Sequence, residues 1–235
     1  MLCQNFIRYL KMNYLFDNMF GNKYPDHNYH KLYDYPNPEE INSSLMKVVE
    51  ESLLSNATGG CRRTDFHTLL EKRCQVKELD ILLSWVKEKC ALFSRNYSTI
   101  NSPYTMNDEE QYVENARKGI EPPSHAGGGG EGSFNPFGFE IGECWGLSYG
   151  EGSGVVTHSH YPWPIAFVYY VNTPEGSAPV RLGFANDYEE INPKAGQLLF
   201  LDGHTKHGVP LRISKVSGRM IIAGLFTYIP KNLKK

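Results

Sequence analysis

Hydrophobic positions in the first half of the chain recur at the spacing of an α-helix. The first stripe consists of Leu45, Val48, Val49 and Leu53. Residues three and four positions apart share one helix face, so this stripe predicts an amphipathic helix. Asn37 is its expected N-cap, with Pro38 at the first helical position and Glu40 three residues after the cap.

A second stripe predicts another helix, from Val76 to about Arg95. Its expected buried side consists of Leu79, Leu82, Trp85, Val86 and Phe93. A shorter helix is expected to begin at Asn107, because the three acidic residues that follow suit the positive end of a helix dipole. We therefore expect the first half of the chain to be mainly helical.

The second half of the chain has the pattern of β-structure. Strands are predicted over residues 137–149, 155–160, 165–171, 197–201, 207–213 and 219–229. The segment Ile165–Val171 is almost continuously apolar, which predicts a strand that is buried on both faces. Between the two halves, residues 120–133 contain the run Gly127–Gly130 and are expected to form an exposed loop, either a lid over a site or an insertion with no role.

Short strands separated by glycine and proline turns are typical of a sandwich or jelly roll. We therefore predict an α+β fold in which N-terminal helices pack against a jelly-roll core. Residues 1–119 are expected to form the mainly helical region, and residues 120–235 the core, as one domain overall.

Composition restricts the classes of function. The 235 residues carry a net charge of -2, and 21% of them are charged, so no broad basic surface for nucleic acid is expected. No run approaches the ~18 apolar residues of a membrane span, and the first twenty residues are too polar for a signal peptide. The five cysteines include no CxxC pair and are odd in number, which favours structural thiols in a reducing compartment. A cytoplasmic protein without membrane or nucleic-acid partners is the expectation.

Three histidines are the strongest chemical signal. His158 and His160 are two positions apart in a predicted strand, so both side chains point to the same face. His207 follows a hydrophobic strand and a glycine turn, where a third ligand returns to the same site. Together the three predict a divalent metal site; His204, which lies in the turn itself, is expected beside the site or at the surface. Imidazole suits Zn, Cu, Fe and Ni, and open positions on one face of the metal favour non-haem Fe(II).

Arg219 lies in the otherwise apolar segment 218–224. An arginine that points inward from such a strand needs an anionic partner, because a buried unpaired cation is costly. A guanidinium binds a carboxylate through two parallel hydrogen bonds. A dicarboxylate that chelates iron at one end and pairs with Arg219 at the other meets this demand. The alternative is an arginine that reaches solvent or forms an internal salt bridge.

Several stretches together resemble a known enzyme family. They are residues 143–152, 158–163, 167–172, 196–201, 207–210 and 218–219. The ordered set is similar to 2-oxoglutarate/Fe(II) oxygenases related to prolyl hydroxylases, of the type found in phages and marine bacteria. It covers about Glu143 to Tyr228, a little over a third of the chain.

The resemblance implies a double-stranded β-helix core with Fe(II), 2-oxoglutarate and O₂ as cofactor and co-substrates. It implies that His158 and His207 bind the iron and that Arg219 binds the co-substrate. Tyr149 and Tyr170 are candidates for donating a hydrogen bond to 2-oxoglutarate. The implied activity is hydroxylation of a protein side chain, of prolyl type, or of a small molecule, while 2-oxoglutarate yields succinate and CO₂. Trp163 and Trp145 are candidates for the substrate pocket. Core packing is the alternative for these aromatic residues.

One position departs from the family pattern, which has His-x-Asp/Glu followed by a distant histidine. Here His160 stands at the carboxylate position. Either His160 binds the metal in place of the carboxylate, or His158 and His207 bind alone with water; we favour His160 as a ligand.

Two other functions remain open at this stage. A cupin-like metal dioxygenase or isomerase fits the HxH, but the glutamate expected after it is missing and Arg219 would have no role. A non-catalytic jelly-roll binding module would make the histidines incidental. The sequence identifies neither the substrate nor the oligomeric state.

Overall fold

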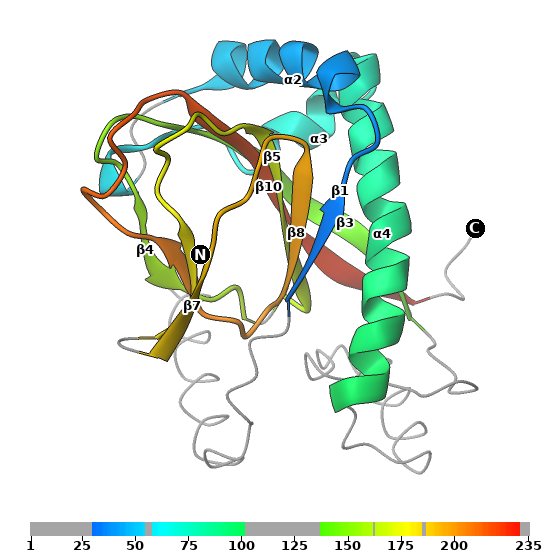
Figure 1. Cartoon of the computed structure of the whole chain (residues 1–235). Helices are drawn as coiled ribbons and strands as arrows, with labels where there is room; N and C mark the ends of the chain where they lie inside the picture. The colour runs from blue at the N-terminus through cyan, green and yellow to red at the C-terminus, as the bar shows by residue number, and fades with distance from the viewer. Residues whose placement is uncertain (1–29, 55–57, 102–136, 162, 185–186, 231–235) are drawn as a thin grey trace, which may run out of the picture.

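Two antiparallel β-sheets face each other, and helices cover the outer face of the larger sheet (Figure 1). The computed structural model describes residues 30–54, 58–101, 137–161, 163–184 and 187–230. In this part of the chain the larger sheet has six strands in the order β1-β8-β5-β10-β3-β2, and the smaller has four in the order β4-β9-β6-β7. The fold is α+β, as predicted.

The elements follow one another in a simple order. The first half contains β1 (His30–Asp34), α2 (Pro38–Ser52), a 3-10 turn η1 (Thr58–Gly60), β2 (Arg62–Arg63), α3 (Thr68–Lys72) and α4 (Lys77–Asn101). The second half contains β3 (Phe137–Tyr149), β4 (Val155–His158), β5 (Ile165–Asn172), β6 (Val180–Phe184), β7 (Asp187–Ile191), β8 (Gln197–Asp202), β9 (His207–Val209) and β10 (Arg219–Pro230).

The larger sheet is buried on both faces. In β5, Phe167 and Tyr169 belong to a core shared with the helices, whereas Ala166 and Tyr170 belong to a second core shared with the smaller sheet. Alternate residues of a strand point to opposite faces, so a sheet covered on both sides must be apolar at nearly every position. This arrangement confirms the predicted burial of β5 on both faces.

A β-bulge in β3 decides which of its side chains face the smaller sheet. Leu225 of β10 pairs with Glu143, but Phe226 pairs with Ile141, so Gly142 is an extra residue in β3. An extra residue reverses the alternation of the strand. As a result Ile141 packs on the helix side, whereas Trp145 packs in the core between the sheets.

Several sequence predictions of the elements are confirmed and others need correction. The helices predicted around Val48 and Leu82 are α2 and α4. Asn37 is the N-cap of α2 and Pro38 is its first residue, although the Asn37 side chain makes no capping hydrogen bond. The strands predicted to reach His160 and Ile213 end at His158 and Val209. Beyond Val209 the ladder cannot continue, because Pro210 has no N–H to donate.

Four strands were not predicted. They are β1, β2, β6 and β7, which are short or rich in charged residues. The first half of the chain thus contributes an edge strand at each end of the larger sheet. The helix predicted from Asn107, the glycine-rich loop and the boundary between residues 119 and 120 lie outside the described residues, so the domain division stays a prediction.

Two further observations concern the described residues alone. Their helices include none with the length and hydropathy needed to span a membrane. Cys61, Cys74, Cys90 and Cys144 are free thiols, and all but Cys74 are buried.

The contact between α2 and β3 gives the first testable prediction. A methyl group at Gly146 would lie 2.6 Å from Cγ1 of Val49 and 2.8 Å from its Cγ2. We expect Gly146→Ala to lower the free energy of unfolding by about 1–3 kcal/mol, because it overpacks this contact. Urea denaturation followed by circular dichroism measures the change.

The double variant Gly146→Ala/Val49→Ala is the matched control, since it removes both methyl groups that clash. The losses of unfolding free energy in the single variants Gly146→Ala and Val49→Ala should then sum to more than the loss in the double variant, by roughly 0.5 kcal/mol or more. Additive costs would show that Gly146 does not set the distance between α2 and β3.

Candidate metal and ligand pocket

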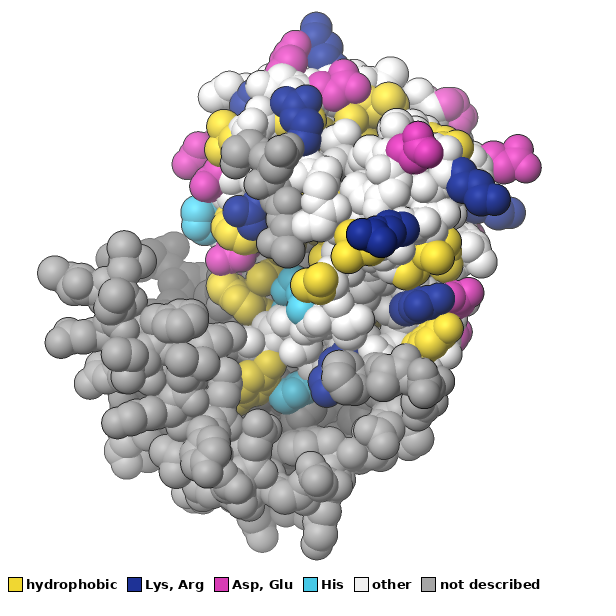
Figure 2. Space-filling model, turned by 90° about the vertical axis from the view of Figure 1, so that its left-hand side faces the viewer, with side chains coloured by type: hydrophobic (Ala, Val, Ile, Leu, Met, Phe, Trp, Pro, Cys, Tyr) yellow, Lys and Arg dark blue, Asp and Glu magenta, His cyan; other side chains and the backbone are white. Residues whose placement is uncertain are grey.

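A pocket of about 600 Å³ lies between the two sheets. All eight side chains that the sequence analysis selected line it: His158, His160, His207, Arg219, Tyr149, Tyr170, Trp145 and Trp163. On the face drawn in Figure 2, histidine and hydrophobic side chains lie next to one another at the surface. The fold therefore brings into one place residues that are separated by up to 74 positions in the chain, from Trp145 to Arg219.

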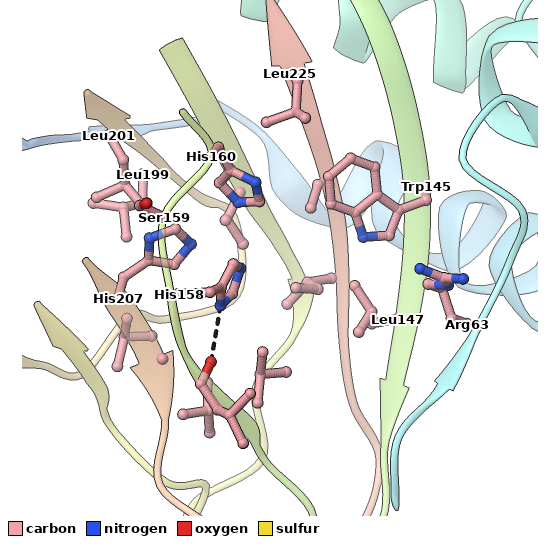
Figure 3. A pocket seen from close by; sticks show the side chains of 18 of the residues that line it. Arg63, Trp145, Leu147, His158, Ser159, His160, Leu199, Leu201, His207 and Leu225 are labelled. Atoms are coloured by element: carbon pink, nitrogen blue, oxygen red, sulfur yellow. Dashed lines mark hydrogen bonds between the residues drawn. The ribbon is translucent and has the colours of Figure 1, made fainter. Parts of the chain in front are cut away.

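The three histidines form a compact group. His158 of β4 is paired directly with His207 of β9, so their side chains point to the same side of the smaller sheet. The ring centroids of these two residues are 4.5 Å apart, and that of His160 is 4.8 Å from His158 and 5.0 Å from His207. One nitrogen of each ring lies within 4.8 Å of the others. Figure 3 shows the three rings converging on one side of the pocket.

His160 reaches this group by a different route from the predicted one. It lies in the turn after β4 and is not part of the strand. Its backbone N–H donates to the carbonyl of Gly203 at 2.9 Å, and the N–H of Gly203 donates to the carbonyl of Pro164 at 3.0 Å. The turn that carries His160 is therefore fixed against the β8–β9 connection, which also precedes His207.

Backbone carbonyls orient two of the rings. Nδ1 of His158 lies 2.8 Å from the carbonyl oxygen of Val156, and Nδ1 of His207 lies 2.9 Å from that of Thr205. A carbonyl oxygen only accepts, so Nδ1 carries the proton in both residues. In a neutral ring Nε2 then presents its lone pair, and a hydrogen bond of this kind typically orients a metal-binding histidine.

Burial keeps the rings of His207 and His160 neutral. Burial lowers the pKa of His207 to about 4, with the neighbouring His158 adding to the effect. Burial likewise holds the pKa of His160 well below its ordinary value, and His207 and His158 lower it further. Neutral imidazoles are the form that binds metals. The chemistry and spacing of these donors fit a divalent transition metal, with no carboxylate in the group among the described residues.

Arg219 lies on the wall formed by the larger sheet and is only 3% exposed. It is paired with Tyr149 of β3, and Ile221, two residues further along β10, is paired with Tyr170 of β5. The guanidinium carbon lies 5.2 Å from the ring centroid of each tyrosine. Its Nη1 donates to the carbonyl of Ala178 at 2.7 Å, whereas its buried Nε has no hydrogen-bond partner.

A buried cation with an unused donor is unfavourable unless an anion accompanies it. No carboxylate of the described residues forms a salt bridge with Arg219. The two tyrosine faces offset only part of the cost. Burial raises the pKa of Tyr149, and it raises that of Tyr170 to about 12, although Arg219 opposes both shifts. Both phenols therefore remain protonated and able to donate a hydrogen bond to an anion beside Arg219.

The tryptophans border the histidine group. The ring centroid of Trp145 lies 6.2 Å from that of His160. Trp163 follows His160 by three residues, and its backbone N–H donates to the carbonyl of His160 at 2.8 Å. The ring of His204 lies against that of Tyr161, with centroids 4.7 Å apart, and is outside the histidine group, as expected.

Sequence reasoning missed two charged residues of the pocket, Arg63 and Glu143. Glu143 could have been predicted from the sequence, because it lies two residues before Trp145 in a predicted strand and so points to the same face. Arg63 gave no signal, because an Arg-Arg pair in a polar segment usually lies in solvent. Only its pairing with β3 shows that one of the two arginines faces the pocket.

Comparison with known proteins gives likeness of structure only. No family model matches the chain, and no curated protein sequence matches it. A prolyl hydroxylase from Trichoplax adhaerens, solved with a hypoxia-inducible-factor peptide, has 16% identity and a TM-score of 0.49 over 95% of this chain and 93% of its own.

Two other solved structures have similar values. A prolyl-4-hydroxylase from Pseudomonas putida has 14% identity and a TM-score of 0.48 over 86% of this chain and 92% of its own. The viral collagen prolyl hydroxylase of Paramecium bursaria Chlorella virus-1, solved with 2-oxoglutarate, has 15% identity and a TM-score of 0.48 over 86% of this chain and 96% of its own. Because all these values are low, the assignment of function depends on the side chains of this chain.

The close approach of Gly203 to the His160 turn gives a second prediction. A methyl group at Gly203 would overlap the carbonyl oxygen of Trp163. We expect Gly203→Ala to displace the turn and to weaken Co(II) binding about tenfold or more, in the same direction as His160→Ala. Isothermal titration with Co(II) measures the affinity, and the melting temperature of the metal-free protein reports on folding.

Gly150→Ala is the matched control, because a methyl group there meets no atom within 4 Å. It should bind Co(II) as the unchanged protein does. Full Co(II) affinity in both Gly203→Ala and His160→Ala would exclude His160 as a ligand.

Proposed function

We propose that this protein is an Fe(II)- and 2-oxoglutarate-dependent oxygenase that hydroxylates its substrate. In this proposal the two facing sheets are the two sides of a double-stranded β-helix. Fe(II) is held by His158, His160 and His207, and 2-oxoglutarate pairs with Arg219. The site contributes three imidazoles on one wall of the pocket and a guanidinium on another.

The unused Nε donor of Arg219 is the observation that carries the proposal. This nitrogen is buried in the wall of the pocket that holds the three histidines. A metal site alone would not need a buried cation on the facing sheet. A ligand with a carboxylate at its far end would accept from Nε, balance the charge and extend toward the metal.

The protein's own groups bind, orient and exclude water. Fe(II) with bound 2-oxoglutarate supplies the oxidation of a C–H bond by O₂, with succinate and CO₂ as products. Tyr149 and Tyr170 stand beside Arg219 and offer hydroxyl donors to a carboxylate. The walls between the charged end and the histidines are apolar, and include Leu199, Ile221 and Ala223, which limits the entry of water.

A cupin-like metal enzyme without 2-oxoglutarate is the second candidate. It would use the same histidines and would also accommodate the absence of a carboxylate among the described members of the group. It would leave the buried Arg219 without a role. A non-catalytic binding module would account for neither the histidines nor the arginine. The substrate class stays open at this level: a protein side chain, of prolyl type, or a small molecule.

Replacement of Arg219 tests the co-substrate. We expect Arg219→Met to weaken 2-oxoglutarate binding by about 10- to 100-fold, because it removes a charge-assisted pair of hydrogen bonds. Binding of Co(II) should not change, since the arginine belongs to the other sheet. Equilibrium titration of the Co(II)-loaded protein with 2-oxoglutarate measures the effect.

Stability separates this role from a structural one. A buried cation without an anionic partner stabilises little, so Arg219→Met should melt at the same or a higher temperature when no ligand is present. Arg181→Met, on the outer hairpin where Arg181 pairs with Glu190, is the control and should leave 2-oxoglutarate binding unchanged. Unchanged affinity in Arg219→Met would exclude the assigned role.

A further inference from the structure

Arg63 is placed by strand register on the pocket wall that faces the histidines. It is paired with Leu147 of β3, so the two side chains point to the same face of the larger sheet. Leu147 belongs to the core between the sheets. Arg62 is paired with Ser148, points to the other face and is exposed. Figure 3 shows Arg63 beside Leu147 and Trp145, across the pocket from His158.

A continuous aromatic surface connects Arg63 with the histidine group. The guanidinium carbon of Arg63 lies 4.0 Å from the ring centroid of Phe66. Phe66 packs edge-on against Trp145 with centroids 5.1 Å apart, and Trp145 lies beside His160. An arginine held against a ring loses less freedom when it binds a ligand, because its position is already restricted.

The Arg63 guanidinium makes no salt bridge or side-chain hydrogen bond with any described residue. It is half-buried and lines the pocket between the sheets. Its position also differs from that of Arg219. The two arginines come from β2 and β10, the strands on either side of β3. Two strands separated by a third lie about 10 Å apart. A ligand paired with Arg219 leaves Arg63 available for a second molecule.

Glu143 restricts the class of ligand that can bind at Arg63. It lines the same wall two residues before Trp145. Burial raises the pKa of its carboxyl, while His67 and Arg63 lower it. A part of the wall in which one arginine lies near one carboxyl disfavours a polyanion, and it suits a ligand that carries a single carboxylate.

We propose that Arg63 binds a carboxylate of the primary substrate, whose body lies against Trp145 and points its reacting carbon toward the histidine group. This inference rests on the proposed function and narrows its substrate to a molecule or chain end with a free carboxylate. A protein substrate would have to present a C-terminal or side-chain carboxylate at Arg63.

The test compares ligands that differ only in this group. The probes are N-acetyl-L-amino acids and the matching N-acetyl-L-amino-acid amides, whose acetyl group prevents chelation of the metal by the amine. They are titrated by saturation-transfer NMR into the full chain, loaded with Zn(II) and saturated with 2-oxoglutarate. We expect the acids to bind the unchanged protein at least tenfold more tightly than the amides.

Variants assign this preference to one arginine. Arg63→Gln should abolish it, Arg63→Lys should keep part of it because the charge remains, and Arg62→Gln should leave it intact as the adjacent control. The proposal is overturned if the unchanged protein shows no preference for acids, or if Arg63→Gln retains the full preference.

A failure of the proposed function gives a different result. If 2-oxoglutarate does not bind, the same probes are titrated without it. A preference that disappears in Arg63→Gln but persists in Arg219→Met then supports the carboxylate site by itself. A preference that disappears only in Arg219→Met overturns it.

Discussion

Burial of both faces of the six-stranded sheet is the constraint on which the rest of this structure depends. The helices α2 and α4 cover one face, and the four-stranded sheet faces the other. The inner side of the larger sheet must therefore be apolar wherever the sheets meet. The pocket is the space that the two sheets leave unfilled. Its walls are mainly apolar, so its few polar groups are the ones that can bind a ligand specifically.

The two sheets divide the chemistry between them. The smaller sheet and its connections supply the histidines, and the larger sheet supplies Arg219 and the aromatic wall. The bulge at Gly142 turns Glu143, Trp145 and Tyr149 toward the pocket. A ligand between the sheets can therefore contact a metal on one side and a cation on the other. The cost of burying Arg219 without an anion is the physical reason to expect such a ligand.

The elements that could be predicted from the sequence are those whose side-chain periodicity determines their structure. The apolar run of β5 and the stripes of α2 and α4 follow from spacing alone. The grouping of His158 and His160 was predicted for a partly wrong reason. The rings do meet, but His160 comes from a turn that Gly203 fixes, and a hydrogen bond between distant segments is not visible in local spacing.

Pairing between distant segments accounts for what the sequence did not predict. The edge strands β1 and β2 are short and polar, so they have no periodicity of their own and form only by pairing with β8 and β3. Arg63 depends entirely on such pairing, since its register with Leu147 distinguishes it from Arg62. The roles of the metal ligands and of Arg219 remain predictions that geometry supports.

Anaerobic titration of the protein with Fe(II), and then with 2-oxoglutarate, tests the central claim most directly. The visible metal-to-ligand charge-transfer band reports chelation of iron by 2-oxoglutarate within one site. We expect a band that appears only when both are present and reaches its maximum at one equivalent of iron. Stoichiometric iron binding without this band would contradict a shared site for metal and co-substrate, and an absence of stoichiometric iron would contradict the metal centre itself.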